Sequence, residues 1–212
     1  MSLAAVAAAS PREPLNELAI RTRITALGRL REYARGANLE ASDADPAARV
    51  ALRIVSSGMV ALVMHDPDPR PVALFGPGDV VDALRPDPIH GRWSLTALAV
   101  SNVHEIGEDA LQGLPFEGEL TAWRLRHERI ARGRLLDLMI ATRIPDVDER
   151  LLRLVRVAGL STREGDRVHW PFTQTQFAAL AGLSRAHLNT RLGVLRSSGR
   201  LVIEDRIAIL GR

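Results

Sequence analysis

The sequence contains no cysteine and no lysine among its 212 residues. The absence of cysteine excludes disulfides, cysteine-ligated zinc and iron–sulfur clusters. Because lysine is missing, all 28 basic residues are arginine, which explains a pI of about 10.6 although the formal net charge is only +3. A GC-rich coding sequence accounts for this bias, and arginine is also well suited to phosphate and base contacts. The positions of the arginines are therefore more informative than their number.

Long apolar runs are also absent, since no stretch approaches the ~20 residues that a membrane-spanning helix needs. The opening MSLAAVAAAS is apolar but short and has no charged n-region, so we expect a flexible tail over 1–18 rather than a secretory signal. With 46% hydrophobic and 25% charged residues, the composition is that of a globular protein. We expect no membrane partner and a cytoplasmic location.

Short apolar runs separated by turn signals dominate the first half of the chain. One or two short helices are expected within 15–35. Strands are expected in the segments 49–66 (two strands around Ser56-Ser57-Gly58), 72–75 and 94–106 (two strands). Loops or turns are expected at 41–48, 66–71, 76–79 and 85–91, which are rich in proline, glycine and aspartate. This spacing predicts an antiparallel sandwich or barrel.

The composition changes after Pro115. The segment 116–144 has no proline and is rich in leucine, arginine and alanine, which predicts one long helix. Its apolar residues mostly return every three or four positions: Leu120, Trp123, Ile130, Leu135, Leu138 and Met139. Such a helix packs against its own domain or forms a dimer seam.

Helix-boundary signals organise the last part of the chain. Asp146 and Asp148 suit the start of a helix over 148–159. Thr173 is a predicted N-cap, with Gln176 three residues later as in a capping box. Gly182 ends this second helix.

A third helix starts behind Ser184 and ends near 197–199, and 201–209 alternates as a small hairpin would. Helix, glycine turn, helix and hairpin together predict a winged helix-turn-helix. The predicted buried seam consists of Phe177, Leu180, Leu183, Leu188, Leu192 and Leu195.

That seam leaves polar residues outward at the start of the last helix: Ser184, Arg185, His187 and Asn189. In this motif the corresponding part of the helix enters the major groove of DNA. Arg185 suits the O6 and N7 atoms of a guanine, and Thr173, Gln174 and Ser184 suit phosphate contacts near helix N-termini. Residues 173–212 carry six arginines against Glu204 and Asp205, a net charge of +4 that favours DNA. The alternative is a helical hairpin whose polar residues are only solvated.

The chain resembles the Crp/Fnr family of cyclic-AMP receptor protein-like transcription regulators. FTQTQFAALAGLSRAHLNTRLGVL (172–195) resembles the family's helix-turn-helix, including Gly182, Ser184 and Arg185. YARGANLEASDADPAARVALRIVSSGMVALV (33–63) and FGPGDVVDAL (75–84) resemble parts of its β-roll sensor domain. The helix at 116–144 stands where the family has its dimerisation helix.

The resemblance implies an α+β fold with an N-terminal antiparallel β-roll like a cyclic-nucleotide-binding domain. The expected domains are the roll (19–115), the dimerisation helix (116–144) and a C-terminal winged helix-turn-helix (145–212). The implied partners are double-stranded DNA and a second copy of the chain on a palindromic operator, with RNA polymerase as a further candidate and an unidentified small-molecule effector.

The recognition helix also departs from the family. Ala186 stands where many members have a base-reading glutamate, and Thr190 where many have a second arginine. Arg191 stands where the motif usually has an apolar core residue. The operator is therefore not expected to copy that of other members, and Arg185 is the strongest candidate for reading a base.

The predicted effector pocket departs further. By the resemblance it comprises Gly78, Asp79, Asp82, Ala83 and Arg92. The family's ribose-binding glutamate falls at Ala83, with Asp82 one position away, and a tryptophan follows Arg92 where a small hydroxyl residue would be expected. A buried cyclic phosphate would then lack charge pairing and hydrogen bonds, so we expect a degenerate or non-cyclic-nucleotide sensor.

Neither a cofactor nor catalysis is expected. A lone histidine such as His65, His90 or His104 is more often a surface or core residue than a haem ligand. The sequence has no Walker loop, Gly-x-Ser-x-Gly, His-Glu-x-x-His or Rossmann fingerprint. The alternative to a DNA-binding regulator is a protein-interaction module with a degenerate roll and a winged helix that no longer binds DNA.

Overall fold

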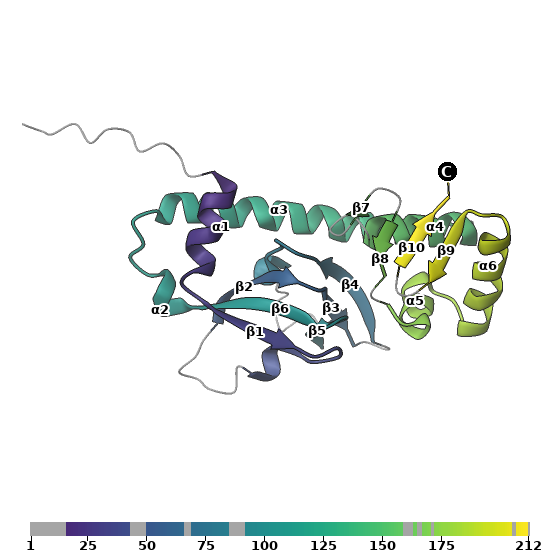
Figure 1. The fold of residues 1–212 in the computed structure, drawn as a ribbon, viewed down its shortest axis with the longest axis horizontal. Helices are drawn as coiled ribbons and strands as arrows, with labels where there is room; N and C mark the ends of the chain where they lie inside the picture. Colours follow the sequence, from purple (N-terminus) through teal and green to yellow (C-terminus); the bar gives the residue numbers. More distant parts are fainter. Residues whose placement is uncertain are drawn as a thin grey trace, which may run out of the picture.

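The computed structural model describes residues 16–42, 50–65, 69–84, 92–158, 163–164, 167–170, 172–204 and 207–211. Its described strands form three antiparallel sheets, with orders β1-β6-β2, β4-β3-β5 and β7-β8-β10-β9. The first two sheets belong to the N-terminal part and the third to the C-terminal part. A long helix, α3, runs along the molecule and connects the two parts (Figure 1).

The N-terminal part has the expected strands between two helical segments. Its elements are α1 (Glu17–Thr25), β1 (Arg29–Tyr33), η1 (Leu39–Ser42), β2 (Val50–Ser57), β3 (Val60–Met64), β4 (Arg70–Phe75), η2 (Val81–Leu84), β5 (Trp93–Ala97), β6 (Ser101–Gly107) and α2 (Glu108–Leu111). Both three-stranded sheets contribute buried side chains to one apolar core, including Val55 and Val103 from one sheet and Leu62, Phe75 and Leu95 from the other. The antiparallel β-roll is therefore confirmed.

Two details make the sequence-based expectations more specific, and a third corrects the turn expected at 66–71. Only one helix lies within the described part of 15–35, because residues 29–33 pair as β1 with β6. The strands on either side of Gly58 belong to different sheets, and Gly58 turns the chain with φ at 85°. A Cβ there would lie 2.4 Å from the Val100 carbonyl oxygen, so only glycine fits. Pro71 lies inside β4, which tolerates it because β4 is an edge strand.

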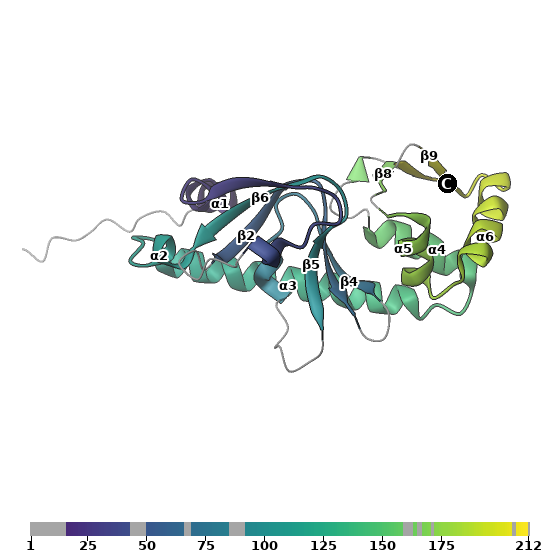
Figure 2. The same cartoon turned by 90° about the horizontal axis from the view of Figure 1, so that it is seen from below.

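The expected long helix is confirmed as α3 (Glu117–Thr142). It lies along the N-terminal sheets over much of its length (Figures 1 and 2). Leu120, Trp123 and Leu138 are buried as the periodicity predicts, whereas Ile130 and Met139 are 37% and 52% exposed. A helix that packs on one side buries only one face, so some of the predicted apolar residues remain exposed to solvent.

The C-terminal part has the expected three helices and hairpin. Its elements are α4 (Val147–Ala158), β7 (Arg163–Glu164), β8 (Arg167–His169), α5 (Gln174–Ala181), α6 (Arg185–Ser197), β9 (Leu201–Glu204) and β10 (Ile207–Leu210). The predicted hairpin is β9 and β10, and β8 extends it into a sheet. Strands β7 and β8 were not predicted, because runs of two or three residues carry no alternation pattern.

The core of the C-terminal part continues into the roll. Phe177, Leu180 and Leu195 share a buried cluster with Leu138 of α3 and with Met59 beside β3. Helices α5 and α6 thus pack against both the roll and the long helix. Residues 1–15 of the predicted tail and the predicted loop at 85–91 lie outside the described residues. Within the described part, no helix combines the length and the apolar character that crossing a membrane requires.

Candidate nucleic-acid interface

The start of α5 is fixed by the predicted capping box. The Gln176 backbone amide donates to Thr173 Oγ1 over 3.1 Å, and the Thr173 amide donates to Gln176 Oε1 over 2.9 Å. Gly182 ends α5 with φ at 67°, a left-handed conformation that favours glycine. The two helices of the motif are therefore joined by a turn whose geometry the sequence dictates.

The start of α6 presents polar side chains to the outside. Ser184 caps the helix, since its hydroxyl accepts the His187 backbone N–H over 3.2 Å. Ser184, Arg185, His187 and Asn189 are exposed, while Leu188 is fully buried beneath them. No acidic residue lies in the first turn of α6, and Arg185 has no acidic partner among the described residues. The helix start can therefore receive an anionic partner.

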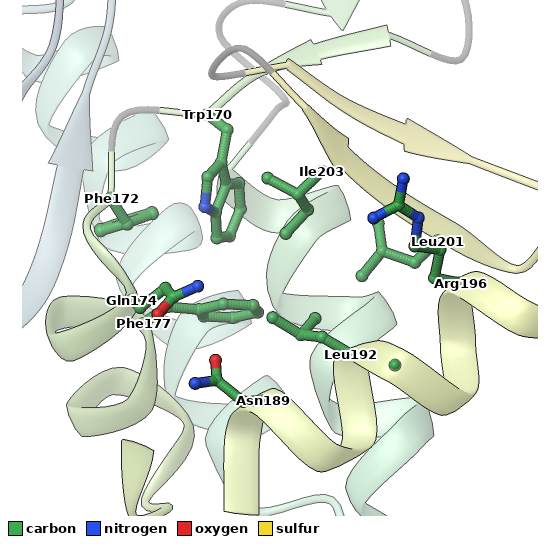
Figure 3. Close-up of a pocket in the computed structure, with 10 residues that line it drawn as sticks. Trp170, Phe172, Gln174, Phe177, Asn189, Leu192, Arg196, Leu201 and Ile203 are labelled. Carbon is green, nitrogen blue, oxygen red and sulfur yellow. The ribbon is translucent and has the colours of Figure 1, made fainter. Parts of the chain in front are cut away.

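Gln174 and Asn189 lie beside a pocket between α5, α6 and β9, as Figure 3 shows. The pocket has a volume of about 390 Å³ and an aromatic wall. The Trp170 ring packs edge-on against Phe177 at 4.5 Å and against Phe172 at 5.0 Å between ring centroids. These rings pack α5 against the segment that follows β8.

Arg191 stands where an apolar core residue is expected, and its charge is paired with an acidic residue of the protein. Its Nε donates to Asp148 Oδ1 over 2.8 Å, and its Nη2 donates to Asp148 Oδ2. The hydrogen bonds to Asp148 raise the pKa of Arg191, and the charges of Asp148 and Asp146 act in the same direction. Asp146 itself caps α4, because its Oδ1 accepts the Glu149 amide over 2.8 Å. The two predicted helix-start acids thus have different partners.

A second arginine connects the end of α3 to the helix-turn-helix. The Arg150 guanidinium donates to three backbone carbonyls: Ile144 over 2.7 Å, Pro145 over 3.2 Å and Ala181 over 2.9 Å. The first two lie between α3 and α4, and the third lies at the end of α5 next to the Gly182 turn. The position of the turn is therefore linked to the end of α3. Sequence reasoning did not find this contact, because nothing distinguishes Arg150 from its neighbours in α4.

The outward face of α3 carries an apolar stripe. Leu125, Leu136, Met139 and Ile140 are between 52% and 60% exposed. Leu125 and Leu136 are eleven residues apart, which is about three helical turns, so they lie on the same side of the helix. Trp123, His127 and Leu138 are buried against the remainder of the chain on the other side. Arg129 and Arg132 are exposed on this face between Leu125 and Leu136, so the stripe is densest at Leu136, Met139 and Ile140 near the end of α3. Exposed apolar side chains gathered on one face of a helix are typical of a surface that pairs with another protein.

Of the residues predicted for the effector pocket, Asp82 and Ala83 line one pocket beside η2, and Gly78, Asp79 and Arg92 are not in its described lining. The Asp79 carboxylate accepts the Gly76 amide over 2.7 Å and the guanidinium of Arg134 on α3. Asp82 accepts the Arg53 backbone N–H over 2.6 Å and Arg53 Nη1 over 3.1 Å. Both carboxylates are thus occupied by the protein itself.

The other predicted pocket residues place no polar side chain in the roll interior. Ala83 has an apolar side chain and Gly78 has none. Arg92 is exposed. The following residue, Trp93, packs against the apolar core of the roll.

A buried charge cluster in the roll was not predicted. Arg53 is fully buried, and its Nε lies 3.8 Å from Glu105 Oε1. Glu105 also accepts hydrogen bonds from Tyr33 and from Arg29 Nε, the latter over 3.1 Å. Glu105 and Asp82 thus place negative charge beside the buried Arg53 guanidinium, as a buried charge requires. Alternation alone cannot find Arg53, since it occupies an inward position normally given to an apolar residue.

The comparisons with known proteins identify the fold. No protein-family model and no curated protein matches the sequence. Among solved structures, FixK2 from Bradyrhizobium japonicum is 16% identical, with a TM-score of 0.64 over 87% of this chain and 93% of that one. TTHB099, a CRP family transcriptional regulator from Thermus thermophilus, is 16% identical, with a TM-score of 0.61 over 85% and 91% of the two chains.

A cyclic nucleotide-binding domain containing protein from Listeria monocytogenes EGD-e is 14% identical, with a TM-score of 0.66 over 92% of this chain and 97% of that one. The chain therefore has the fold of CRP/FNR family transcription regulators over nearly its whole length. The fold class and the resemblance expected from the sequence are confirmed at the level of the fold.

Proposed function

We propose that this protein is a sequence-specific DNA-binding transcription regulator of the CRP/FNR type. The observation that carries the proposal is the exposed start of α6. Arg185 lies there without an acidic partner among the described residues, behind the Ser184 cap and above the buried Leu188. This is the part of the motif that enters the major groove, where arginine pairs with guanine. His187 and Asn189 complete the base-facing surface, and Thr173, Gln174 and Ser184 contact the phosphates.

The regulator acts as a homodimer through the apolar stripe of α3. Pairing two copies along this stripe would bury Leu125, Leu136 and Ile140, which are otherwise about 60% exposed. A two-fold dimer presents two α6 helices, so the operator is a palindrome with half-sites about one DNA turn apart. In this proposal 19–115 is the sensor-like roll, 116–144 the dimerisation helix and 145–212 the DNA-binding domain. RNA polymerase is a proposed further partner on the promoter.

The roll is a degenerate sensor that does not bind a cyclic nucleotide. Asp79 and Asp82, the candidate acidic groups, are engaged by Arg134 and Arg53, and Ala83 provides no hydrogen-bonding side chain. The roll then acts on DNA binding through its contact with α3. The Asp148–Arg191 pair weakens the alternative of a lost DNA-binding function, because it supplies a structural reason for the unusual arginine in α6.

A binding selection from genomic DNA fragments tests the proposal. It uses purified full-length protein at near-physiological salt with no added ligand. The proposal expects one inverted-repeat motif to be enriched under these conditions. Enrichment that appears only with cyclic AMP or cyclic GMP would contradict the degenerate sensor. Absence of enrichment with and without cyclic nucleotides or cell extract would favour the protein-interaction module.

A further inference from the structure

An open cleft lies where the roll, the long helix and the helix-turn-helix meet. Its volume is about 720 Å³, within the range of ~300–1,000 Å³ that is typical of small-molecule sites. The roll contributes residues from β3, β4 and η2, α3 contributes its last two turns, and α5 contributes Ala179 and Leu180. The cleft is therefore built by all three parts of the chain.

The described lining of the cleft is mainly apolar, with Thr142 as an uncharged polar residue, and its charged side chains are all positive. Leu62, Leu135 and Leu138 belong to its lining, together with Met64, Val72 and Met139. Among the described residues, the charged ones in the lining are Arg70, which begins β4, and Arg143, which follows α3. Both arginines are exposed, and neither has an ion pair within the described part of the chain. The described lining holds no acidic residue that would neutralise them.

Two other pockets, as far as their described linings extend, lack this combination. In the pocket of Figure 3 the charged residue of the described lining is Arg196, and it already donates to Glu204 Oε1 over 2.6 Å. The pocket beside η2 contains both signs of charge, since Asp82 and Glu128 accompany Arg124 in its lining. Of these three pockets, the cleft is therefore the one in which an anion finds unpaired guanidinium groups next to apolar surface, as far as the described residues extend.

We propose that this cleft binds a small-molecule monocarboxylic acid with an apolar body. The apolar part lies against Leu135 and Leu138, and the carboxylate pairs with Arg70 or Arg143. Burial of apolar surface supplies most of the affinity, and a charge-assisted hydrogen bond to a guanidinium selects the acid over neutral or cationic analogues. This site lies at the junction of the roll with α3 and α5, apart from Gly78, Asp82 and Arg92.

The site would also regulate DNA binding, a consequence that rests on the proposed function. Leu180 and Gly182 line the cleft, and Gly182 is the turn that sets α6 against α5. Arg143 belongs to the segment whose carbonyls Arg150 holds. A ligand that binds one arrangement of these elements better than another shifts the population of DNA-binding conformers.

Isothermal titration calorimetry of the full-length protein without DNA tests the site. The probes are decanoate, 4-phenylbutyrate and 2-naphthoate, with decylamine as the cationic comparison. We expect at least one of the acids to bind once per chain, and decylamine to bind at least about tenfold more weakly. The variant Arg70→Gln/Arg143→Gln should weaken acid binding at least about tenfold, as expected for loss of charge-assisted hydrogen bonds. Leu135→Trp, which fills the cleft, should abolish it.

Arg156→Gln is the matched control, because Arg156 is an exposed arginine on α4 that does not line the cleft. It should leave the affinity unchanged. Failure of all three acids to bind saturably up to about 1 mM would overturn the inference. So would binding that survives both the double arginine variant and Leu135→Trp. Because no DNA is present, these outcomes are independent of whether the protein binds an operator, which the genomic selection decides separately.

Discussion

Arg191 on α6 and Asp148 on α4 form a bidentate ion pair, with 2.8 Å between Arg191 Nε and Asp148 Oδ1. The pair ties the recognition helix to the first helix of the C-terminal part. It also explains why an arginine is tolerated where related motifs carry an apolar residue. Because the Arg191 guanidinium is paired with Asp148, its charge is not available to DNA, whereas the charge of Arg185 is.

Removing one member of this pair should destabilise the C-terminal part. Arg191→Ala leaves the Asp148 carboxylate, whose side chain is 14% exposed, without its main partner. We expect a lower Tm by circular dichroism. The double variant Asp148→Ala/Arg191→Leu should recover much of the loss, because no charge is left unpaired and leucine can join the core. Equal Tm values for wild type and Arg191→Ala would show that the pair contributes nothing to stability.

Thr173 and Ser184 are expected to combine two roles, capping a helix and contacting phosphate. Aspartate is a good N-cap and suits the positive end of a helix, but it repels phosphate. Thr173→Asp and Ser184→Asp should therefore keep the Tm while lowering DNA affinity. Thr173→Ala should instead cost about 1 kcal/mol of stability, or roughly 2–4 °C in Tm. Full DNA affinity in both aspartate variants would remove these residues from the interface.

The apolar stripe on α3 predicts the oligomeric state. Leu136 is 58% exposed in the single chain, and a glutamate there would place a charge in the seam of a dimer. Leu136→Glu should shift the protein from dimer to monomer in size-exclusion chromatography with light scattering, and weaken binding to a palindrome. Leu18→Glu is the control, since Leu18 is 62% exposed on α1 outside the stripe. A dimer that persists in Leu136→Glu would place the seam elsewhere.

Stability should depend on pH through His127. Burial lowers the pKa of His127 below its usual 6.5, and Arg126 and Arg134 add to this, while Glu17 and Asp79 oppose it. Its Nε2 has no hydrogen-bond partner among the described residues, and its ring packs on Trp123 at 4.3 Å between centroids.

The unfolded chain therefore takes up the proton first as the pH falls, so stability is lost from about 6.5 downward. Chemical denaturation between pH 7.5 and about 5 measures this loss. His127→Phe keeps a ring beside Trp123 and removes the titrating group, so its free energy of unfolding should change less with pH. If the free energy of unfolding changes equally with pH in His127→Phe and in wild type, the pH dependence belongs to other groups. His104 is such a group, because burial also lowers its pKa.

Local signals were sufficient for the helices and the helix-turn-helix of the C-terminal part, although not for its short strands β7 and β8. The Thr173 cap, the Gly182 turn and the Ser184 cap each depend on residues within three positions, and all three are present. Local signals did not determine the roll, because the pairing of residues 29–33 with β6 is a long-range contact that local propensity does not specify. Asp79 and Asp82 appeared as pocket residues in the sequence, but their partners Arg134 and Arg53 are distant in the chain and only the fold brings them together.

The most direct test of the account is the base preference of Arg185→Ala. Wild type and variant are titrated against the selected operator and against operators with every single base pair changed in one half-site. We expect Arg185→Ala to lose about 1–3 kcal/mol of binding free energy and to become indifferent to one guanine-containing base pair in each half-site. Arg156→Ala, an exposed arginine on α4, should change neither quantity. An equal loss on every sequence would make Arg185 a phosphate contact only, and no loss at all would contradict recognition of DNA by the start of α6.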